Sequence, residues 1–214
     1  SIDGTQACID DIAQRHANVI PLVNGNYGMW DSKDEMVNAA VALLTVKVGE
    51  HPNTFLWEVD ADEQWIRHQL ESAEKYLVET GSKTGEFLCD YYVGKDLLAV
   101  GEWGEGKKLP YRRLWRWSGE PFKTHEPPDL EGGNGQTVLC PQRFKHYAYY
   151  FDSDVKFKDL WYSGHEGIYS RWEKLQDMPH GNFPRPISDL ITGPWGKTDT
   201  VIKHINKVIK QDNA

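Results

Sequence analysis

The sequence predicts an α/β fold in which a sheet is flanked by helices. Over the first hundred residues, segments with helical apolar spacing alternate with short β-prone runs, which is the pattern of an α/β sheet. The composition is that of a globular protein, with 39% hydrophobic and 26% charged residues. A length of 214 residues is enough for one domain, or for one domain with an appendage.

The first elements are expected in the order helix, strand, helix. Residues 5–17 show apolar spacing near 3.6 and predict a helix that follows a turn. The short apolar run 18–22 predicts a strand, and a turn-rich loop comes after it. The dipeptide Asp31-Ser32 can cap a second helix that reaches about residue 44.

The next elements surround an acidic segment. Residues 54–59 form a β-prone run that leads into the acids. A helix is expected over about 63–79, because its apolar residues recur on one side. Two further β-prone runs cover 86–93 and 97–100. This region therefore continues the alternation of strands and helices.

The second half of the chain has a different composition. Segment 101–145 is rich in Gly, Pro, Trp and Arg, and it predicts short strands joined by long loops. From His146 the chain reads as a strand, followed by one helix over about 153–172. The tail 177–196 is rich in Pro and Gly, and a last helix is expected over about 198–210.

Charge and hydropathy argue against several classes of protein. The net charge of -8 disfavours a general nucleic-acid binder and a polybasic membrane anchor. No apolar run approaches the roughly 20 residues that span a bilayer, and the first residues lack the features of a signal peptide. Cys8, Cys89 and Cys140 are odd in number and widely spaced. This pattern favours reduced thiols and a cytoplasmic setting, and it disfavours a structural zinc site.

Two carboxylates stand where an apolar strand is expected to end. Asp60 and Asp62 lie on the same side of the chain if the backbone stays extended. Ligands of open α/β sheets gather at the carboxyl ends of strands, and paired carboxylates bind hard cations such as Mg²⁺ or Mn²⁺. A bound ion would neutralise charge on a departing diphosphate. The alternative is a helix N-cap with acids in its first turn, which needs no metal.

Four blocks of sequence, taken in order, carry a resemblance to a known family. Residues 1–5 (SIDGT) look like the end of an acidic turn that contacts a nucleoside, and 30–40 look like the helix that follows it. Residues 56–65 (LWEVDADEQW) look like a strand end with a DXD motif. Residues 146–158 look like a late block in which a His can be a further metal ligand. Together, from residue 1 to about 176, the chain resembles GT-A-fold glycosyltransferases of the family-two-like group.

The resemblance implies a GT-A fold, which is a Rossmann-like mixed sheet flanked by helices. It implies transfer of a hexose, with inversion, from a nucleoside diphosphate sugar to an acceptor hydroxyl. It also implies a Mn²⁺ or Mg²⁺ ion held by Asp60, Asp62 and His146. The residues then expected near the nucleotide sugar are Asp3, Lys33, Asn38 and Asp60.

The acceptor side is expected between the DXD motif and the late block. An inverting transferase needs a carboxylate to take a proton from the acceptor hydroxyl. Glu126 is the preferred base, with Asp129 and Glu63 as further candidates, and each could instead be an exposed loop acid. Aromatic rings can stack on the apolar faces of sugars, although Trp side chains also form protein cores. The acceptor platform is expected to consist of Trp103, Trp115 and Trp117.

The chain departs from the family at its start. A complete GT-A domain has a strand, a helix and a second strand before the acidic turn, and this sequence begins at that turn. We therefore expect an N-terminally truncated fold, which could be a fragment, a degenerate homologue, or a fold completed by a partner chain. By role, residues 1–100 would bind metal and nucleotide sugar, 101–176 would bind the acceptor, and 177–214 would form an extension with a helix.

Two other functions fit some of the same residues. A carbohydrate-binding module without catalysis would also be acidic and rich in Trp, but it would contain many short strands and no long helices. An inactive glycosyltransferase relative would bind neither metal nor nucleotide. For an active enzyme, the expected partners are a nucleoside diphosphate sugar and a glycan or other hydroxyl acceptor. Neither nucleic acid nor a transmembrane segment is expected.

Overall fold

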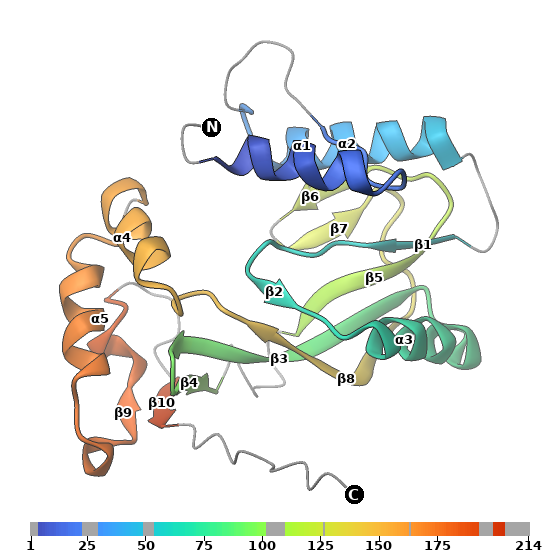
Figure 1. Ribbon diagram of the computed structural model, residues 1–214. Helices are drawn as coiled ribbons and strands as arrows, with labels where there is room; N and C mark the ends of the chain where they lie inside the picture. Colours follow the sequence, from blue (N-terminus) through green and yellow to red (C-terminus); the bar gives the residue numbers. More distant parts are fainter. Residues whose placement is uncertain are drawn as a thin grey trace, which may run out of the picture. The chain divides into compact units, whose positions relative to one another are not determined.

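The protein is a mixed α/β structure with a mostly antiparallel sheet and flanking helices (Figure 1). The chain falls into two compact units, which are described separately. Unit 1 lies within residues 1–54 and 117–133, and unit 2 lies within 55–116 and 134–214. The computed structural model describes residues 4–22, 30–48, 54–101, 110–125, 127–162, 164–192 and 199–203.

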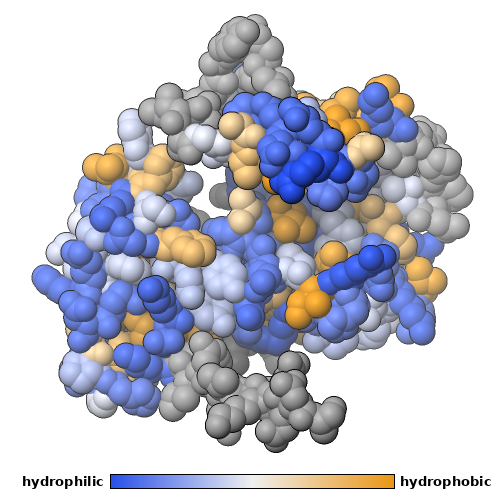
Figure 2. Space-filling model, in the orientation of Figure 1, coloured by the Kyte–Doolittle hydropathy of each residue, from blue (hydrophilic) through white to orange (hydrophobic). Residues whose placement is uncertain are grey.

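The described residues of unit 1 form two helices and a two-stranded hairpin. The helices are α1 (Thr5–Arg15) and α2 (Lys33–Val48), and β6 (Phe122–His125) pairs antiparallel with β7 (Pro128–Leu130). α2 packs against β6. α1 buries none of its residues, and its surface in Figure 2 is mostly hydrophilic. The packing of unit 1 therefore centres on α2 and the hairpin, where Val41 and Phe122 are buried.

The start of α2 is fixed by the cap that the sequence predicts. The Ser32 hydroxyl accepts a hydrogen bond from the backbone N–H of Glu35 at 3.1 Å. The Glu35 carboxylate in turn accepts one from the backbone N–H of Asp31 at 3.0 Å. Such bonds satisfy amide groups that have no partner within a helix. The cap therefore determines where Lys33, the first residue of α2, lies.

Unit 2 is built around one long central strand, β3 (Thr84–Gly94). Along one edge, β3 pairs in parallel with β8 (Thr137–His146). Along the other edge it pairs antiparallel, first with β5 (Tyr111–Trp117) and then with β4 (Leu97–Val100). The outer strands are β1 (Thr54–Trp57) beside β5, β2 (Glu63–Gln64) beside β8, β10 (Thr200–Lys203) beside β4, and β9 (Arg185–Pro186) beside β10.

The core of unit 2 lies on one face of β3. Alternate residues of a strand share a face, and Phe87, Cys89, Tyr91 and Val93 are all buried there. α3 (Arg67–Thr80) adds Ala73 and Leu77 to this core, and α5 (Ile168–Gln176) adds Ile168 and Leu175. Two short 3₁₀ helices, η1 (His180–Asn182) and η2 (Ile187–Asp189), also belong to this unit.

Two elements in the structure differ from the sequence prediction, and local backbone chemistry explains both differences. Residues 18–22 form no strand: α1 ends in a turn in which the Val19 N–H bonds the His16 carbonyl, and Pro21 has no N–H for a strand ladder. The helix predicted over 153–172 is two helices, α4 (Asp152–Trp161) and α5. Gly164 and Gly167 lie between them with φ of 80° and 72°, which are left-handed values outside the helical region.

The predicted C-terminal helix is wrong over residues 200–203. Residues 200–203 form β10, which pairs antiparallel with β4. Three of these four residues, Thr200, Val201 and Ile202, are β-branched and favour a strand. The rest of the predicted helix, 204–210, lies outside the described residues.

Some predictions concern role rather than structure. The division into 1–100, 101–176 and 177–214 concerns the roles of these segments. It stays a prediction, and it differs in kind from the two units, which are defined by packing. In the described part of the chain, no helix combines the length and apolar character that crossing a membrane requires.

All three cysteines are free thiols, with Cys8 exposed and the other two buried. Burial raises the pKa of both Cys89 and Cys140 to about 12.

Candidate metal-binding site

The acidic segment follows β1 and turns back toward the end of β8. Residues 58–62 lead through a turn into β2, which pairs antiparallel with β8 so that Glu63 is opposite His146. The backbone N–H of Tyr147 also donates to the carbonyl oxygen of Asp62 at 2.8 Å. The backbone therefore brings Asp62 and His146 together, although they are far apart in the sequence.

The carboxylate of Asp62 faces the imidazole of His146. Asp62 Oδ2 and His146 Nε2 are 3.5 Å apart, which is long for a hydrogen bond. Burial alone would raise the pKa of Asp62. The polar interaction with His146, followed by the charge of Lys158, outweighs burial and holds this pKa below its ordinary value. Asp62 is therefore an ionised carboxylate at neutral pH, and 33% of its side chain is exposed.

The surroundings of His146 fix its ring. Tyr91 of β3 and Tyr111 of β5 meet it edge-on, with ring centroids 4.9 and 5.7 Å away. Its Nδ1 is buried and has no hydrogen-bond partner among the described residues. The nitrogen that faces a polar group is therefore Nε2, beside Asp62.

The chemistry of the pair fits a shared divalent ion. A carboxylate oxygen and an imidazole nitrogen are donor types that Mn²⁺ accepts. An ion about 2.1 Å from each donor can bridge two atoms whose separation is less than about 4 Å, and the observed separation of 3.5 Å satisfies this condition. Asp62 and His146 thus have the donor chemistry and spacing of two ligands on one ion.

Asp60 has a different partner from Asp62. Its Oδ2 accepts a hydrogen bond from Arg113 Nη2 at 2.9 Å. The same guanidinium donates to Glu63 at 2.7 Å and lies 3.9 Å from Glu58. Burial lowers the pKa of Arg113, but the charges of Glu63, Asp60 and Glu58 and the hydrogen bond to Glu63 raise it overall. Arg113 therefore anchors the acidic segment, and Asp60 is bound to it.

The predicted three-residue metal set is only partly assembled. Among the residues that the structure describes, no three His, Cys, Asp or Glu side chains are grouped so that they could hold a metal ion. Asp62 and His146 come together, whereas Asp60 is engaged by Arg113. An ion on the pair would take its other ligands from water or from a substrate such as a diphosphate.

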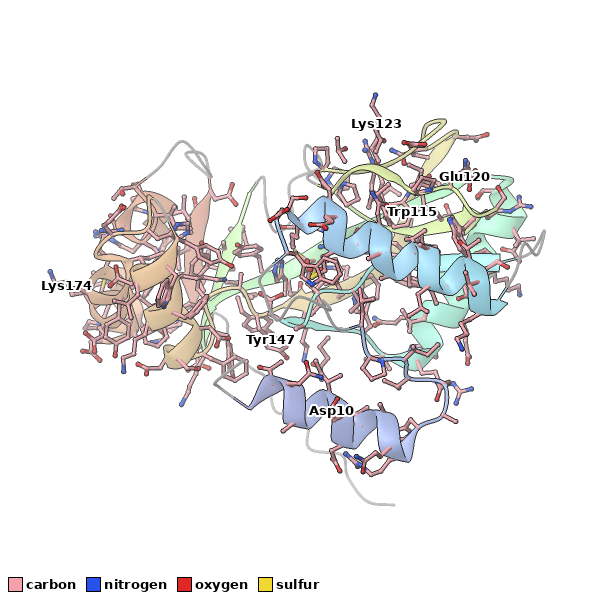
Figure 3. All side chains as sticks on the ribbon, turned by 90° about the horizontal axis from the view of Figure 1, so that it is seen from above. Asp10, Trp115, Glu120, Lys123, Tyr147 and Lys174 are labelled. Atoms are coloured by element: carbon pink, nitrogen blue, oxygen red, sulfur yellow. The ribbon has the colours of Figure 1, made fainter. Side chains whose placement is uncertain are left out.

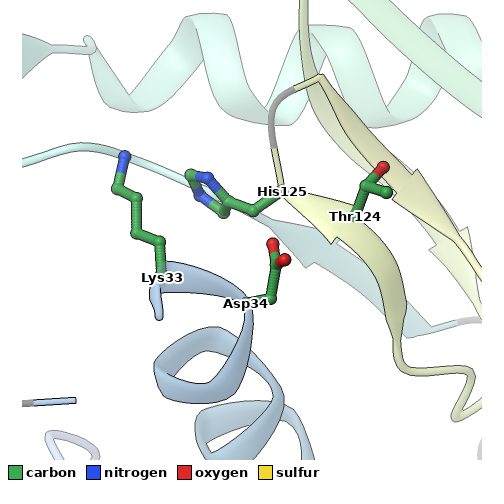
Figure 4. A pocket seen from close by; sticks show the side chains of 4 residues that line it. All are labelled: Lys33, Asp34, Thr124 and His125. Atoms are coloured by element: carbon green, nitrogen blue, oxygen red, sulfur yellow. The ribbon is translucent and has the colours of Figure 1, made fainter. Parts of the chain in front are cut away.

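Lys33 lines a pocket of about 410 Å³ in unit 1 (Figure 4). Lys33 and Asp34 belong to the first turn of α2, and Thr124 and His125 belong to β6. The imidazole of His125 extends between the side chains of Lys33 and Asp34. The Thr124 hydroxyl points away and donates to the Pro127 carbonyl at 2.9 Å. The pocket offers charged groups to a small polar ligand, which is compatible with the role expected of Lys33.

Three predicted binding residues are instead committed to the fold. Both atoms of the Asn38 amide group bond the backbone of Phe122, which ties α2 to the hairpin. Trp115 is completely buried and donates to Asn134 at 3.1 Å. Trp117 is 4% exposed and donates to the Glu120 carbonyl at 2.8 Å. A ring buried to this degree offers no face to a sugar, so the acceptor platform predicted for these two Trp residues is not formed.

Two of the three candidate bases lie among the described residues, and they differ in exposure. Glu63 has a side chain that is 0% exposed and paired with Arg113, so an acceptor has no access to it. Asp129 lies in β7 and is partly exposed. On the paired strand β6, Thr124 is opposite Asp129, and Lys123 points outward from the hairpin (Figure 3). Asp3, Trp103 and Glu126 lie outside the described residues, so their roles stay predictions.

Lys158 of α4 is the residue near this site that the sequence did not single out. Its charge lowers the pKa of Asp62, and the charges of Asp62 and Asp60 in turn act to raise the pKa of Lys158. The sequence alone does not distinguish Lys158 from Lys156, which stands two positions earlier and is exposed in the structure. Only the packing of α4 distinguishes the two lysines.

Comparison of the chain with protein-family models, curated proteins and solved structures finds no match.

Proposed function

We propose that this protein is a metal-dependent glycosyltransferase of the GT-A type, which moves a hexose from a nucleoside diphosphate sugar to an acceptor hydroxyl. The observation that carries the proposal is the approach of Asp62 to His146 within 3.5 Å. The resemblance in sequence implies that both side chains bind one ion. The segments that carry Asp62 and His146 are distant in the chain, and their proximity in the structure supports that assignment.

The residues of the site have distinct tasks in this proposal. Asp62 and His146 would hold Mn²⁺ or Mg²⁺, which neutralises charge on the departing nucleoside diphosphate. Tyr91 and Tyr111 keep the imidazole in place. Arg113 keeps the turn before β2 in place through Asp60 and Glu63. The GT-A assignment rests on the four blocks of sequence and on the position of the acids after β1.

The test is calorimetric titration with UDP-sugars and GDP-sugars, with and without Mn²⁺. We expect the wild-type protein to bind one of these classes only when Mn²⁺ is present. The Asp62→Ala variant should bind roughly tenfold more weakly or worse. Asp96→Ala is the matched control, because Asp96 is exposed in the turn between β3 and β4. Wild-type protein that shows no metal-dependent binding would refute the proposal and favour an inactive relative.

The carbohydrate-binding alternative is disfavoured by the helices. That alternative predicts many short strands and no long helices. The described residues include α2 with 16 residues and α3 with 14 residues. α3 also supplies Ala73 and Leu77 to the core of unit 2, so it is an integral part of the fold. A module made only of short strands would not have this architecture.

A further inference from the structure

Lys158 of α4 is a partly buried cation whose charge interacts with that of the proposed metal ligand Asp62. Its ammonium donates a hydrogen bond to the carbonyl oxygen of Ala148 and lies 4.5 Å from the centroid of the Tyr149 ring. No carboxylate of the described residues forms an ion pair with it within 4.0 Å. Its positive charge is therefore balanced only at longer range.

The segment that carries His146 also positions Lys158. Ala148 and Tyr149 are the second and third residues after His146, and both contact the lysine. Tyr149 is held in turn by backbone hydrogen bonds. Its N–H donates to the Tyr92 carbonyl at 3.1 Å, and its own carbonyl accepts from Trp172 Nε1 at 2.7 Å. The ammonium therefore has a fixed position relative to the metal ligand His146.

The charges of Lys158 and the acidic segment act on each other. Burial lowers the pKa of Lys158, and the charges of Asp62, Asp154 and Asp60 oppose that effect. A buried charge is costly unless a counter-charge meets it. An anionic ligand at this position would supply the counter-charge that the described side chains do not supply at contact distance.

We propose that Lys158 binds the diphosphate of the donor, beside the ion held by Asp62 and His146. This inference rests on the proposed function and deepens it. A diphosphate that shares a divalent ion with two protein ligands keeps part of its negative charge. A lysine meets such an anion as a compact point charge with three donors. In this arrangement the ammonium of Lys158, on α4, would contact the leaving diphosphate.

Lys156 provides a matched control within the same helix. Its ammonium is 2.8 Å from Asp152 Oδ2 and 4.7 Å from the centroid of the Tyr169 ring. It therefore makes one hydrogen bond and one cation–π contact, as Lys158 does. Lys156 differs because its charge is paired with Asp152 and its side chain is exposed. A general effect of removing a lysine charge from α4 would appear in both variants, whereas diphosphate binding concerns only Lys158.

The experiment is calorimetry with Mn²⁺ alone and then with inorganic pyrophosphate at saturating Mn²⁺. In Lys158→Met we expect Mn²⁺ affinity within about twofold of wild type and pyrophosphate affinity reduced roughly tenfold or more. In Lys156→Met both affinities should equal those of wild type. Lys158→Gln keeps a donor for the Ala148 carbonyl and removes the charge. It should match Lys158→Met, and it replaces that variant if the methionine protein does not fold.

Two results would overturn the role of Lys158. One is unchanged pyrophosphate affinity in the uncharged variants. The other is an equal loss of Mn²⁺ and pyrophosphate affinity, which would indicate a structural effect on the site. Failure of the proposed function has a different signature, because the wild-type protein would then bind no Mn²⁺ at all. In that case the proposed function and the role of Lys158 both fail, whereas in the first two cases only the role of Lys158 fails.

Discussion

At the level of single residues, Arg113 determines how the acidic segment is held. Arg113 is 5% exposed, and its guanidinium contacts Asp60, Glu63 and Glu58, three carboxylates that would otherwise repel one another. The side chain of Glu63 is itself 0% exposed. The conformation of the turn before β2, and with it the position of Asp62, therefore depends on one buried cation.

Replacement of Arg113 by Met should destabilise the protein strongly. The substitution keeps an apolar stem but leaves the carboxylate of Glu63 buried without its partner. Breaking a buried ion pair in this way costs about 3–5 kcal/mol. Urea denaturation followed by Trp fluorescence would measure the change in the free energy of unfolding.

The matched control for Arg113 is Arg67→Met on α3. Arg67 pairs with Glu71, and the two side chains are 91% and 61% exposed. An exposed pair of this kind contributes less than about 1 kcal/mol. Equally small losses in both variants would show that the cluster around Arg113 is not the anchor of the acidic segment.

The sequence predicts the types of residue at the site better than their partners. Asp62 and His146 are expected together only through the family resemblance, because the pairing of β2 with β8 leaves no local signal. Asp60 and Asp62 share a side only in an extended chain, and residues 61 and 62 form a turn. The burial of Trp115 likewise follows from tertiary packing, which composition does not show.

At the level of elements, α3 packs closely against the sheet at Gly85 of β3. A Cβ atom at this position would be 3.1 Å from Leu77 Cδ1 and 3.1 Å from Cys140 Sγ. It would also be 3.3 Å from Leu114 Cβ of β5. Helix α3, strand β5 and strand β8 therefore all pack around a residue without a side chain.

Replacement of Gly85 by Ala should lower the stability of unit 2. An extra methyl group in a packed core costs about 1–3 kcal/mol, because neighbouring side chains must move. Thermal and urea unfolding would measure this loss. Gly181→Ala in η1 is the control, since a Cβ there meets nothing within 4 Å. A Gly85→Ala protein as stable as this control would contradict the close packing of α3.

The elements that the sequence predicts well have strong local signals. α1 and α3 follow apolar spacing near 3.6, and β3 and β4 follow β-prone runs on either side of a turn. The segment 198–210 shows the limit of such signals. Its apolar spacing suggests a helix, but pairing with β4 selects a strand over 200–203. Tertiary pairing outweighs a local periodicity in this case.

At the level of the whole molecule, the two units differ in how much they bury. β3 lies between neighbours on both edges, and most of its residues are buried. α1 of unit 1 buries none of its residues. Local stability is expected to follow burial, because exposed elements open without disturbing the core.

Hydrogen–deuterium exchange should therefore divide the described chain into two extremes. Backbone amides of β3 from Phe87 to Val93 should exchange most slowly, and those of α1 should exchange fastest among the helices. Mass spectrometry of peptides covering both elements would measure the rates. Similar protection of α1 and β3 would mean that α1 has a packing partner which this account does not include.

In the function that we propose, Asp62 and His146 form one cation site and Asp60 serves a different purpose. Titration with Mn²⁺ followed by electron paramagnetic resonance tests this claim directly. We predict that Asp62→Asn and His146→Gln each lower Mn²⁺ affinity roughly tenfold or more. Asp60→Asn should keep the affinity within about threefold, because Asp60 is bound to Arg113. Wild-type protein without a Mn²⁺ site, or an Asp60→Asn loss as large as that of Asp62→Asn, would contradict the account.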